Sequence, residues 1–197
     1  MTLDEYRKLF VAVAMALVLI AASPTLGYVL TLPGGERFSE LWVLGPGHMA
    51  ENYPFNVEVG REYSLFVGVG CHMGGSTYYA VYVKFRNETQ PLPDISAKVA
   101  SPLPPLYEFQ VLILNGLTWE SQVNFTILDA YKLGNSTFVR LLSVNGVVFE
   151  VNSTASWNSE YGGFFYQLFF ELWMYDTAVS SFRYHDRFVG LWLNMTV

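Results

Sequence analysis

The sequence predicts an all-β protein, an antiparallel β-sandwich preceded by one N-terminal transmembrane helix. Three observations predict this fold class. The chain of 197 residues is 52% hydrophobic and only 14% charged, whereas typical soluble domains carry about 25% charged residues. From residue 38 onward, apolar and polar residues alternate with a period of two, which is typical of half-buried strands. The first 33 residues instead contain one long apolar run.

The apolar run extends from Leu9 to Leu32 without a charged residue. As a helix it would be about 36 Å long at roughly 1.5 Å per residue, which is enough to cross a ~30 Å hydrocarbon core. Residues 1–33 are therefore predicted to be a cytoplasmic stub and a transmembrane anchor. A signal peptide is the alternative, because residues 9–22 also fit the apolar core of such a segment. Pro24 weighs against an uninterrupted helix, since proline kinks or ends helices.

The charges on either side of this run predict its orientation. Arg7 and Lys8 precede the run, and the acidic remainder of the chain gives a net charge of −6. The positive-inside rule then places the N-terminus in the cytoplasm and residues 34–197 outside the cell. The predicted location is the cell membrane, with a single span and an extracellular C-terminal domain. Nucleic acid is excluded as a partner because its phosphates would repel the acidic chain.

Glycosylation triplets support the extracellular assignment. Five of the ten asparagines begin an Asn-x-Ser/Thr triplet, although serine and threonine make up only about one residue in eight. This excess indicates an exported, N-glycosylated domain. The predicted acceptors are Asn87, Asn124, Asn135, Asn152 and Asn194. The alternative is that a β-protein rich in asparagine and threonine contains these triplets by accident.

The strands of the domain are predicted from alternation and from the turn residues between them. Residues 63–69 and 77–86 are the clearest cases, and Lys84 and Arg86 are expected to point away from the core. Further strands are expected at residues 107–115, 123–128 and 188–197. Some eight or nine short strands without intervening helices favour an antiparallel sandwich.

Three other segments carry more specific local signals. Asn145-Gly146 lies between two apolar runs and readily adopts the positive φ angles of a type I′ hairpin turn. Residues 163–175 are apolar at almost every position, so they form either a central strand covered on both faces or a helix. Residues 90–106 contain five prolines and are expected to form a surface loop or an edge-strand crossing.

Several motifs of the domain also resemble a known family. Residues 38–46 (FSELWVLGP), residues 50–54 (AENYP) and residues 191–196 (LWLNMT) are similar to the mainly archaeal family called domain of unknown function 1616. The resemblance brackets residues 38–197 and departs from the family pattern at residues 135–161, which look like an inserted hairpin. It implies a membrane-tethered, immunoglobulin-like outer-surface domain without an assigned reaction.

A soft-metal site is the sharpest chemical hypothesis. His48 and the triplet of Cys71, His72 and Met73 offer imidazole, thiol and thioether donors, which suit copper. Blue-copper proteins are also β-sandwiches. Neighbours on a strand point to opposite faces, so Cys71 and His72 require a turn to bind one ion. The alternative is a small buried thiol beside a hydrogen-bonded histidine.

Catalytic motifs are missing from the sequence. It contains no Gly-x-Ser-x-Gly elbow, no His-Glu-x-x-His motif and no phosphate loop. Carboxylates such as Glu171 and Asp176 are expected on the solvated face of their strand. The aromatic residues of segment 164–175 are expected mostly in the core, with the remainder forming a flank for a protein, a glycan or the membrane interface.

The sequence therefore predicts a non-enzymatic, membrane-anchored glycoprotein that acts as a binding or scaffolding subunit of a membrane or cell-envelope complex. Its expected partners are the membrane and other membrane or envelope proteins, and it can form a homo-oligomer. No cofactor is expected other than N-linked glycans. The alternative is a membrane-tethered, cupredoxin-like protein that binds copper.

Overall fold

A computed structural model describes residues 6–8, 10–18 and 36–196 of the chain. The chain divides into two compact units, Met1–Arg37 and Phe38–Val197. In the first unit, residues 6–8 and 10–18 are helical. In these described residues there is no helix of the length and apolar character that a membrane span requires. Most of the predicted anchor, residues 1–33, lies outside the described residues.

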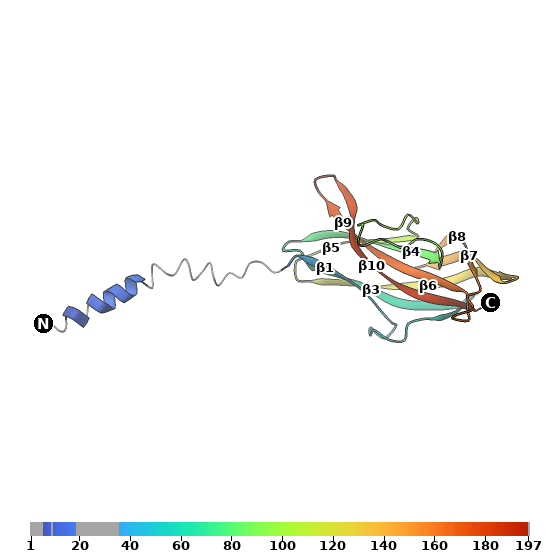
Figure 1. Cartoon of the computed structure of the whole chain (residues 1–197), viewed down its shortest axis with the longest axis horizontal. Helices are drawn as coiled ribbons and strands as arrows, with labels where there is room; N and C mark the ends of the chain where they lie inside the picture. The colour runs from blue at the N-terminus through green and yellow to red at the C-terminus, as the bar shows by residue number, and fades with distance from the viewer. Residues whose placement is uncertain (1–5, 9, 19–35, 197) are drawn as a thin grey trace. The chain divides into compact units, whose positions relative to one another are not determined.

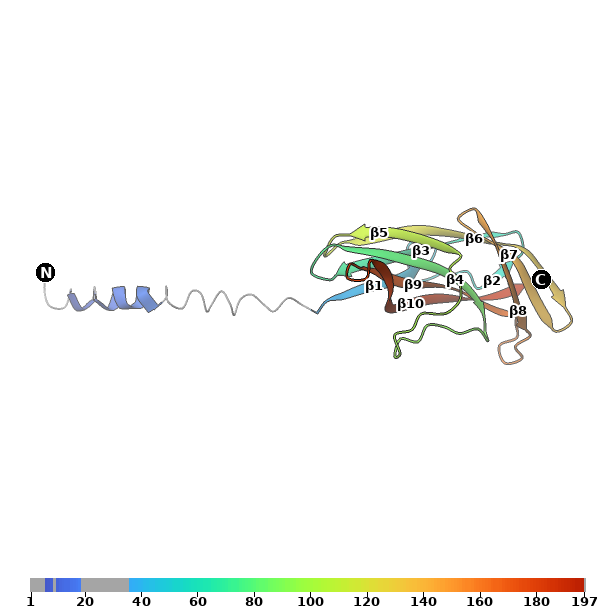
Figure 2. The same ribbon diagram turned by 90° about the horizontal axis from the view of Figure 1, so that it is seen from above.

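Two five-stranded sheets make up the second unit over residues 36–196, and this confirms the all-β class (Figures 1 and 2). The first sheet has the order β1 (Phe38–Leu44), β3 (Glu62–His72), β6 (Thr118–Leu133), β7 (Ser136–Val144) and β8 (Val147–Ser156). The second has the order β2 (Asn56–Glu58), β10 (Ser181–Thr196), β9 (Phe165–Asp176), β4 (Thr77–Asn87) and β5 (Tyr107–Ile113).

The core lies between the two sheets and draws on alternate positions of both. Leu65 and Val67 of β3 face Val81 of β4 and Phe170 of β9 within one buried cluster. These side chains are fully buried. The period of two in the sequence thus reflects strands with one core-facing side, as predicted.

Two local predictions are confirmed. Asn145 and Gly146 have φ angles of 49° and 79° and connect β7 to β8 as a hairpin, which are the signs that a type I′ turn requires. The apolar segment that was ambiguous between strand and helix is strand β9. It lies between β10 and β4 in the second sheet and is buried on both faces over Phe165–Leu172 (Figure 1).

One pairing departs from the predicted antiparallel arrangement. The short strand β2 pairs with β10 in parallel, through Asn56, Val57 and Glu58. The chain reaches β2 from β1, which belongs to the other sheet, rather than through a hairpin. A crossover of this kind permits parallel pairing, whereas a tight turn imposes an antiparallel one.

The orientation predicted for two basic residues is confirmed, but a loop covers the face to which they point. Lys84 and Arg86 do point away from the core, but they are 2% and 5% exposed and so do not face solvent. The proline-rich segment between β4 and β5 folds back over this outer face, where Ser101 contacts Lys84 (Figure 2). A period-two pattern reports only which side of a strand faces the core, so it does not reveal a loop that covers the other side.

Candidate functional site

The outer face of the second sheet carries aligned rows of side chains. Cross-strand pairing places Trp192 beside Gln167, and Gln167 beside Arg86. The next row toward the C-terminal end of β10 pairs Asn194 with Phe165. Because successive residues of a strand point to opposite faces, these residues project away from the core.

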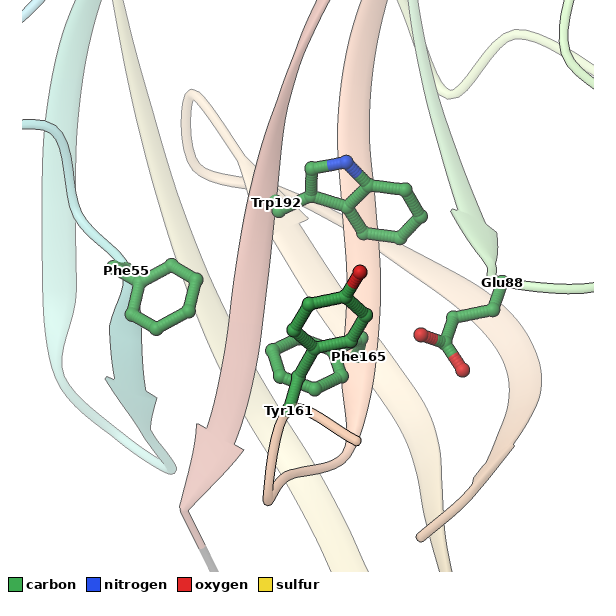
Figure 3. Close-up of a pocket in the computed structure, with 5 residues that line it drawn as sticks. All are labelled: Phe55, Glu88, Tyr161, Phe165 and Trp192. Carbon is green, nitrogen blue, oxygen red and sulfur yellow. The ribbon is translucent and has the colours of Figure 1, made fainter. Parts of the chain in front are cut away.

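An aromatic pocket lies over these two rows. It has a volume of about 410 Å³, and we use the name aromatic pocket for the space lined by Phe55, Glu88, Tyr161, Phe165 and Trp192 (Figure 3). Three of its rings are well exposed, with exposed fractions of 49% for Phe55, 69% for Tyr161 and 40% for Trp192. In Figure 3 the Tyr161 ring lies in front of Phe165, and the Glu88 carboxylate points toward the rings.

Each lining residue comes from a different segment of the chain. Phe55 immediately precedes β2, and its carbonyl oxygen accepts a hydrogen bond from the Asn194 backbone at 2.7 Å. Glu88 follows β4, and Tyr161 lies in the connection between β8 and β9. Phe165 and Trp192 stand on the two central strands β9 and β10. Strands β9 and β10 therefore form the base of the pocket, and its sides are residues from the connections between strands.

The Asn158 side chain joins two walls of the pocket. Its Nδ2 donates to Glu88 Oε1 at 2.9 Å. Its Oδ1 accepts hydrogen bonds from the backbone amides of Glu160 at 3.0 Å and Tyr161 at 3.2 Å, a local arrangement that asparagine side chains favour in turns. One amide group thus positions both the carboxylate and the tyrosine.

The Asn194 side chain joins the segment that carries Phe165 to the segment that carries Phe55. Its Oδ1 accepts from the Phe164 backbone amide at 3.2 Å, and its Nδ2 donates to Asn56 Oδ1 at 2.9 Å. A Cβ atom on Gly163 would clash with this amide, so the close approach requires glycine at that position. The segments that carry Phe55 and Phe165 are thereby held together.

Arg86 supports the pocket from below without lining it. Its guanidinium donates through Nη2 to the Glu88 carbonyl oxygen at 2.9 Å and through Nη1 to the Gln90 carbonyl oxygen. Its Cζ lies 5.4 Å from the centre of the Trp192 ring, within the range of a cation–π contact. Burial lowers the pKa of Arg86 from its ordinary value, and the nearby charge of Glu88 opposes this shift.

A buried ion pair fastens the proline-rich segment to the same face. Lys84 Nζ lies 2.8 Å from Glu171 Oε2, and both side chains are essentially inaccessible to solvent. The Ser101 backbone amide donates to Glu171 Oε1 at 2.9 Å, and the Ser101 carbonyl oxygen accepts from Lys84 Nζ at 2.8 Å. The expectation that Glu171 lies on a solvated face is therefore wrong, because the same loop that buries Lys84 covers it.

The predicted copper ligands occupy separate environments. Cys71 is fully buried in the core, and its Sγ lies 3.5 Å from Thr77 Oγ1. The adjacent His72 points to the opposite face, stacks on Phe38 and lies 3.6 Å from Glu40. Met73 packs against the core from a partly buried position.

His48 lies far from the other predicted ligands. Its ring stacks on Phe66 at 3.6 Å, and its Nδ1 lies 2.7 Å from Glu120 Oε1. Phe66 is six residues before His72 on β3, a separation of roughly 20 Å at 3.3 Å per residue. Within the described part of the chain, no group of three or more His, Cys, Asp or Glu residues could hold a metal ion.

The five predicted glycan acceptors differ in exposure. The exposed ones are Asn135 and Asn152, and the half-buried ones are Asn87, Asn124 and Asn194. A glycan attaches to the side-chain nitrogen. In Asn87 this nitrogen donates to the carbonyl oxygen of Thr154 at 2.7 Å. In Asn194 it donates to Asn56 Oδ1 at 2.9 Å. The geometry therefore favours Asn135 and Asn152 as acceptors.

The pocket is the feature that the sequence patterns do not reveal. Trp192 is predicted as a strand residue, Phe165 lies in the segment left open between strand and helix, and Glu88 is only the middle residue of a glycosylation triplet. The one available signal is the aromatic excess of segment 164–175, which is expected to leave part of its rings outside the core. Phe165 on the outer face is such a ring.

Comparison with known proteins shows a family but no characterised relative. Residues 32–138, more than half of the chain, match the family described as a domain of unknown function, DUF1616. This confirms the resemblance seen in the sequence, although the motif at residues 191–196 lies outside the matched span. No curated protein matches the chain.

Two solved structures match the chain at a low level of similarity. One is a β-glucosidase from Listeria innocua in complex with gluconolactone, with 9% identity, a TM-score of 0.39 and coverage of 82% of this chain and 16% of that chain. The other is one chain in the crystal structure of the complex between zinc 2-glycoprotein and prolactin-inducible protein from human seminal plasma, with 7% identity, a TM-score of 0.39 and coverage of 84% of this chain and 100% of that chain. The chain thus spans about a sixth of the β-glucosidase, and neither likeness informs on function.

Proposed function

The chain belongs to the DUF1616 family, and from this premise we propose that it is a membrane-anchored surface protein that binds a partner through the aromatic pocket. In this proposal, the apolar N-terminal run anchors the chain by a single span. Residues 34–197 form an immunoglobulin-like, N-glycosylated domain outside the cell. The domain is non-enzymatic and acts as a binding or scaffolding subunit of a membrane or cell-envelope complex.

The aromatic pocket is the observation that carries the proposal. Burial of apolar area stabilises by about 25 cal/mol per Å², so rings left in water forgo that stabilisation. Tyr161, Phe55 and Trp192 nevertheless gather around one space instead of packing into the core. Hydrogen bonds of two asparagines fix the loops that carry the pocket walls. A concave apolar site with a few convergent polar groups is the usual form of a binding site.

The exposed acceptors support the extracellular part of the proposal. Asn135 lies at the turn between β6 and β7, and Asn152 lies on the edge strand β8. Both belong to the first sheet, whereas the aromatic pocket lies on the second sheet. Neither acceptor is among the residues that line the aromatic pocket.

Two measurements on the full-length protein in its native cells test the proposal. First, an external protease on intact cells should remove a C-terminal tag and spare an N-terminal tag, and the intact mass should exceed the polypeptide mass by whole glycans. A protected C-terminal tag and an unmodified mass would overturn the predicted sidedness.

The second measurement is co-purification after crosslinking. A partner in stoichiometric amount should accompany the wild type and be lost from Trp192→Ala. The matched control is Leu133→Ser, which replaces another exposed apolar residue at the β6–β7 turn. Retention of the partner by Trp192→Ala, or purification of the wild type alone, would contradict binding through the aromatic pocket.

A further inference from the structure

We propose that the group bound in the aromatic pocket is an alkylammonium cation, held against the rings with Glu88 as its counter-charge. This inference rests on the proposed function and names the chemistry of the bound group. The cation can belong to a lysine side chain of a partner or to a free quaternary ammonium compound. Both carry a positively charged nitrogen on alkyl carbon, with three N–H donors in lysine and none in a quaternary ammonium compound.

The arrangement of the rings suits a cation better than a flat ligand. The Phe55 and Phe165 ring centres are 6.1 Å apart at an angle of 39°, and the Tyr161 and Phe165 ring centres are 6.2 Å apart at 90°. The rings therefore enclose the space at different inclinations instead of forming one stacking platform (Figure 3). Ring faces within about 6 Å of a cation attract it through their quadrupole.

The charge of the pocket also favours a cation. Glu88 is the one charged residue among the five that line it. Its Oε1 accepts a single hydrogen bond from Asn158, and a carboxylate has about four acceptor positions, so it can still receive an ammonium group. The excess of acidic residues over the whole chain, a net charge of −6, attracts cations as well.

Arg86 already makes the type of contact that we propose. Its guanidinium lies 5.4 Å from the Trp192 ring and is bound to two backbone carbonyl oxygens at the base of the site. Arg86 is 5% exposed and does not line the aromatic pocket. It therefore holds Trp192 and Glu88 in place and leaves the space above them free.

Other ligand classes fit the lining less well. An anion would meet the Glu88 carboxylate. A sugar presents many hydroxyl groups, but the side chains of the five lining residues offer only that carboxylate, the Tyr161 hydroxyl and the Trp192 indole N–H for hydrogen bonds. Polar groups buried without partners would weaken its binding. A quaternary ammonium group needs only a counter-charge and apolar contact, and the N–H donors of a lysine ammonium can be accepted by the Glu88 carboxylate and the Tyr161 hydroxyl.

The test is an NMR titration of the full chain in an uncharged detergent, in which the Trp192 indole N–H signal is followed. The probes are tetramethylammonium chloride, N-acetyl-lysine methylamide and the uncharged, similarly shaped tert-butanol. We expect saturable shifts with at least one of the two cations and at least fivefold weaker binding of tert-butanol. Glu88→Gln should weaken cation binding about fivefold or more, whereas Glu150→Gln, at an exposed carboxylate of β8, should leave it unchanged.

The outcomes separate this inference from the proposed function. Tighter binding of tetramethylammonium would identify a quaternary ammonium ligand, and tighter binding of the lysine derivative would identify a partner's side chain. Equal binding of tert-butanol, or unchanged binding in Glu88→Gln with a wild-type spectrum, would overturn the inference. If neither cation binds but Trp192→Ala still loses its partner, the inference fails and the proposed function stands.

Discussion

Replacement of Lys84 by methionine tests the role of the buried ion pair most directly. The substitution keeps most of the side-chain volume and removes the charge that faces Glu171 at 2.8 Å. It also removes the hydrogen bond to the Ser101 carbonyl oxygen. Breaking a buried pair by deleting one partner costs about 3–5 kcal/mol, because the remaining charge stays buried without its counter-charge. Glu171 keeps only its hydrogen bonds from the Ser101 backbone amide and the Trp173 indole N–H. We therefore expect Lys84→Met to lower the free energy of unfolding by about that amount.

Thermal and urea unfolding of the full chain, followed by tryptophan fluorescence, measure this loss. For a chain of this size each kcal/mol shifts Tm by about 2–4 °C, so the expected drop is about 6–20 °C. The control is Lys98→Met in the same proline-rich segment. Lys98 lies 3.4 Å from Asp186 and is 75% exposed, so we expect its loss to cost less than about 1 kcal/mol.

A double variant separates the cost of the unpaired charge from other effects. Lys84→Met with Glu171→Gln removes both charges and keeps a side-chain oxygen that can accept from the Ser101 backbone amide. Removing both charges of a buried pair is far less costly than removing one. We expect the double variant to regain at least about 2 kcal/mol. A double variant less stable than Lys84→Met, or a single variant within about 1 kcal/mol of wild type, would refute the reasoning.

Three further predictions concern packing, glycosylation and pH. Gly163→Ala should lower the free energy of unfolding by about 1–3 kcal/mol, because the added Cβ would clash with the side-chain amide of Asn194. Gly75→Ala, with open space around it, should unfold thermally almost like the wild type. Asn135→Gln and Asn152→Gln should each reduce the intact mass of the native protein by one glycan, and an unchanged mass in both would contradict the assignment. Burial lowers the pKa of His185 below its usual 6.5, so the unfolded chain binds a proton more readily and stability should fall as pH drops through about 6.5 toward 5. His185→Gln should flatten this slope in urea titrations at several pH values.

The elements of the fold were predictable because each depends on local sequence. Alternation over residues 63–69 and 77–86 locates β3 and β4, and the Asn145-Gly146 pair locates a hairpin through its backbone preference. The parallel pairing of β2 was not predictable from local patterns. It depends on which sheet the chain enters after β1, and a three-residue strand carries little pattern of its own.

The candidate site was much less predictable, because it depends on segments that are distant in the sequence. Glu88 and Tyr161 are brought together by one asparagine side chain, and no spacing rule relates them. Lys84 and Glu171 show why polarity alone is a poor guide to exposure. Each looks like a solvent-facing strand residue, yet each is buried because the opposite charge and a covering loop are supplied elsewhere in the chain.

The hydrogen bonds of Asn158 have a consequence for how the aromatic pocket can change. The same amide group bonds the Glu88 carboxylate on one side and the backbone N–H of Tyr161 on the other, so the positions of these two segments are coupled. Glu88→Gln keeps an oxygen that can accept from Asn158 Nδ2, so it changes the charge and leaves the loop of Tyr161 in place. A substitution of Asn158 itself would release both the carboxylate and the loop that carries Tyr161.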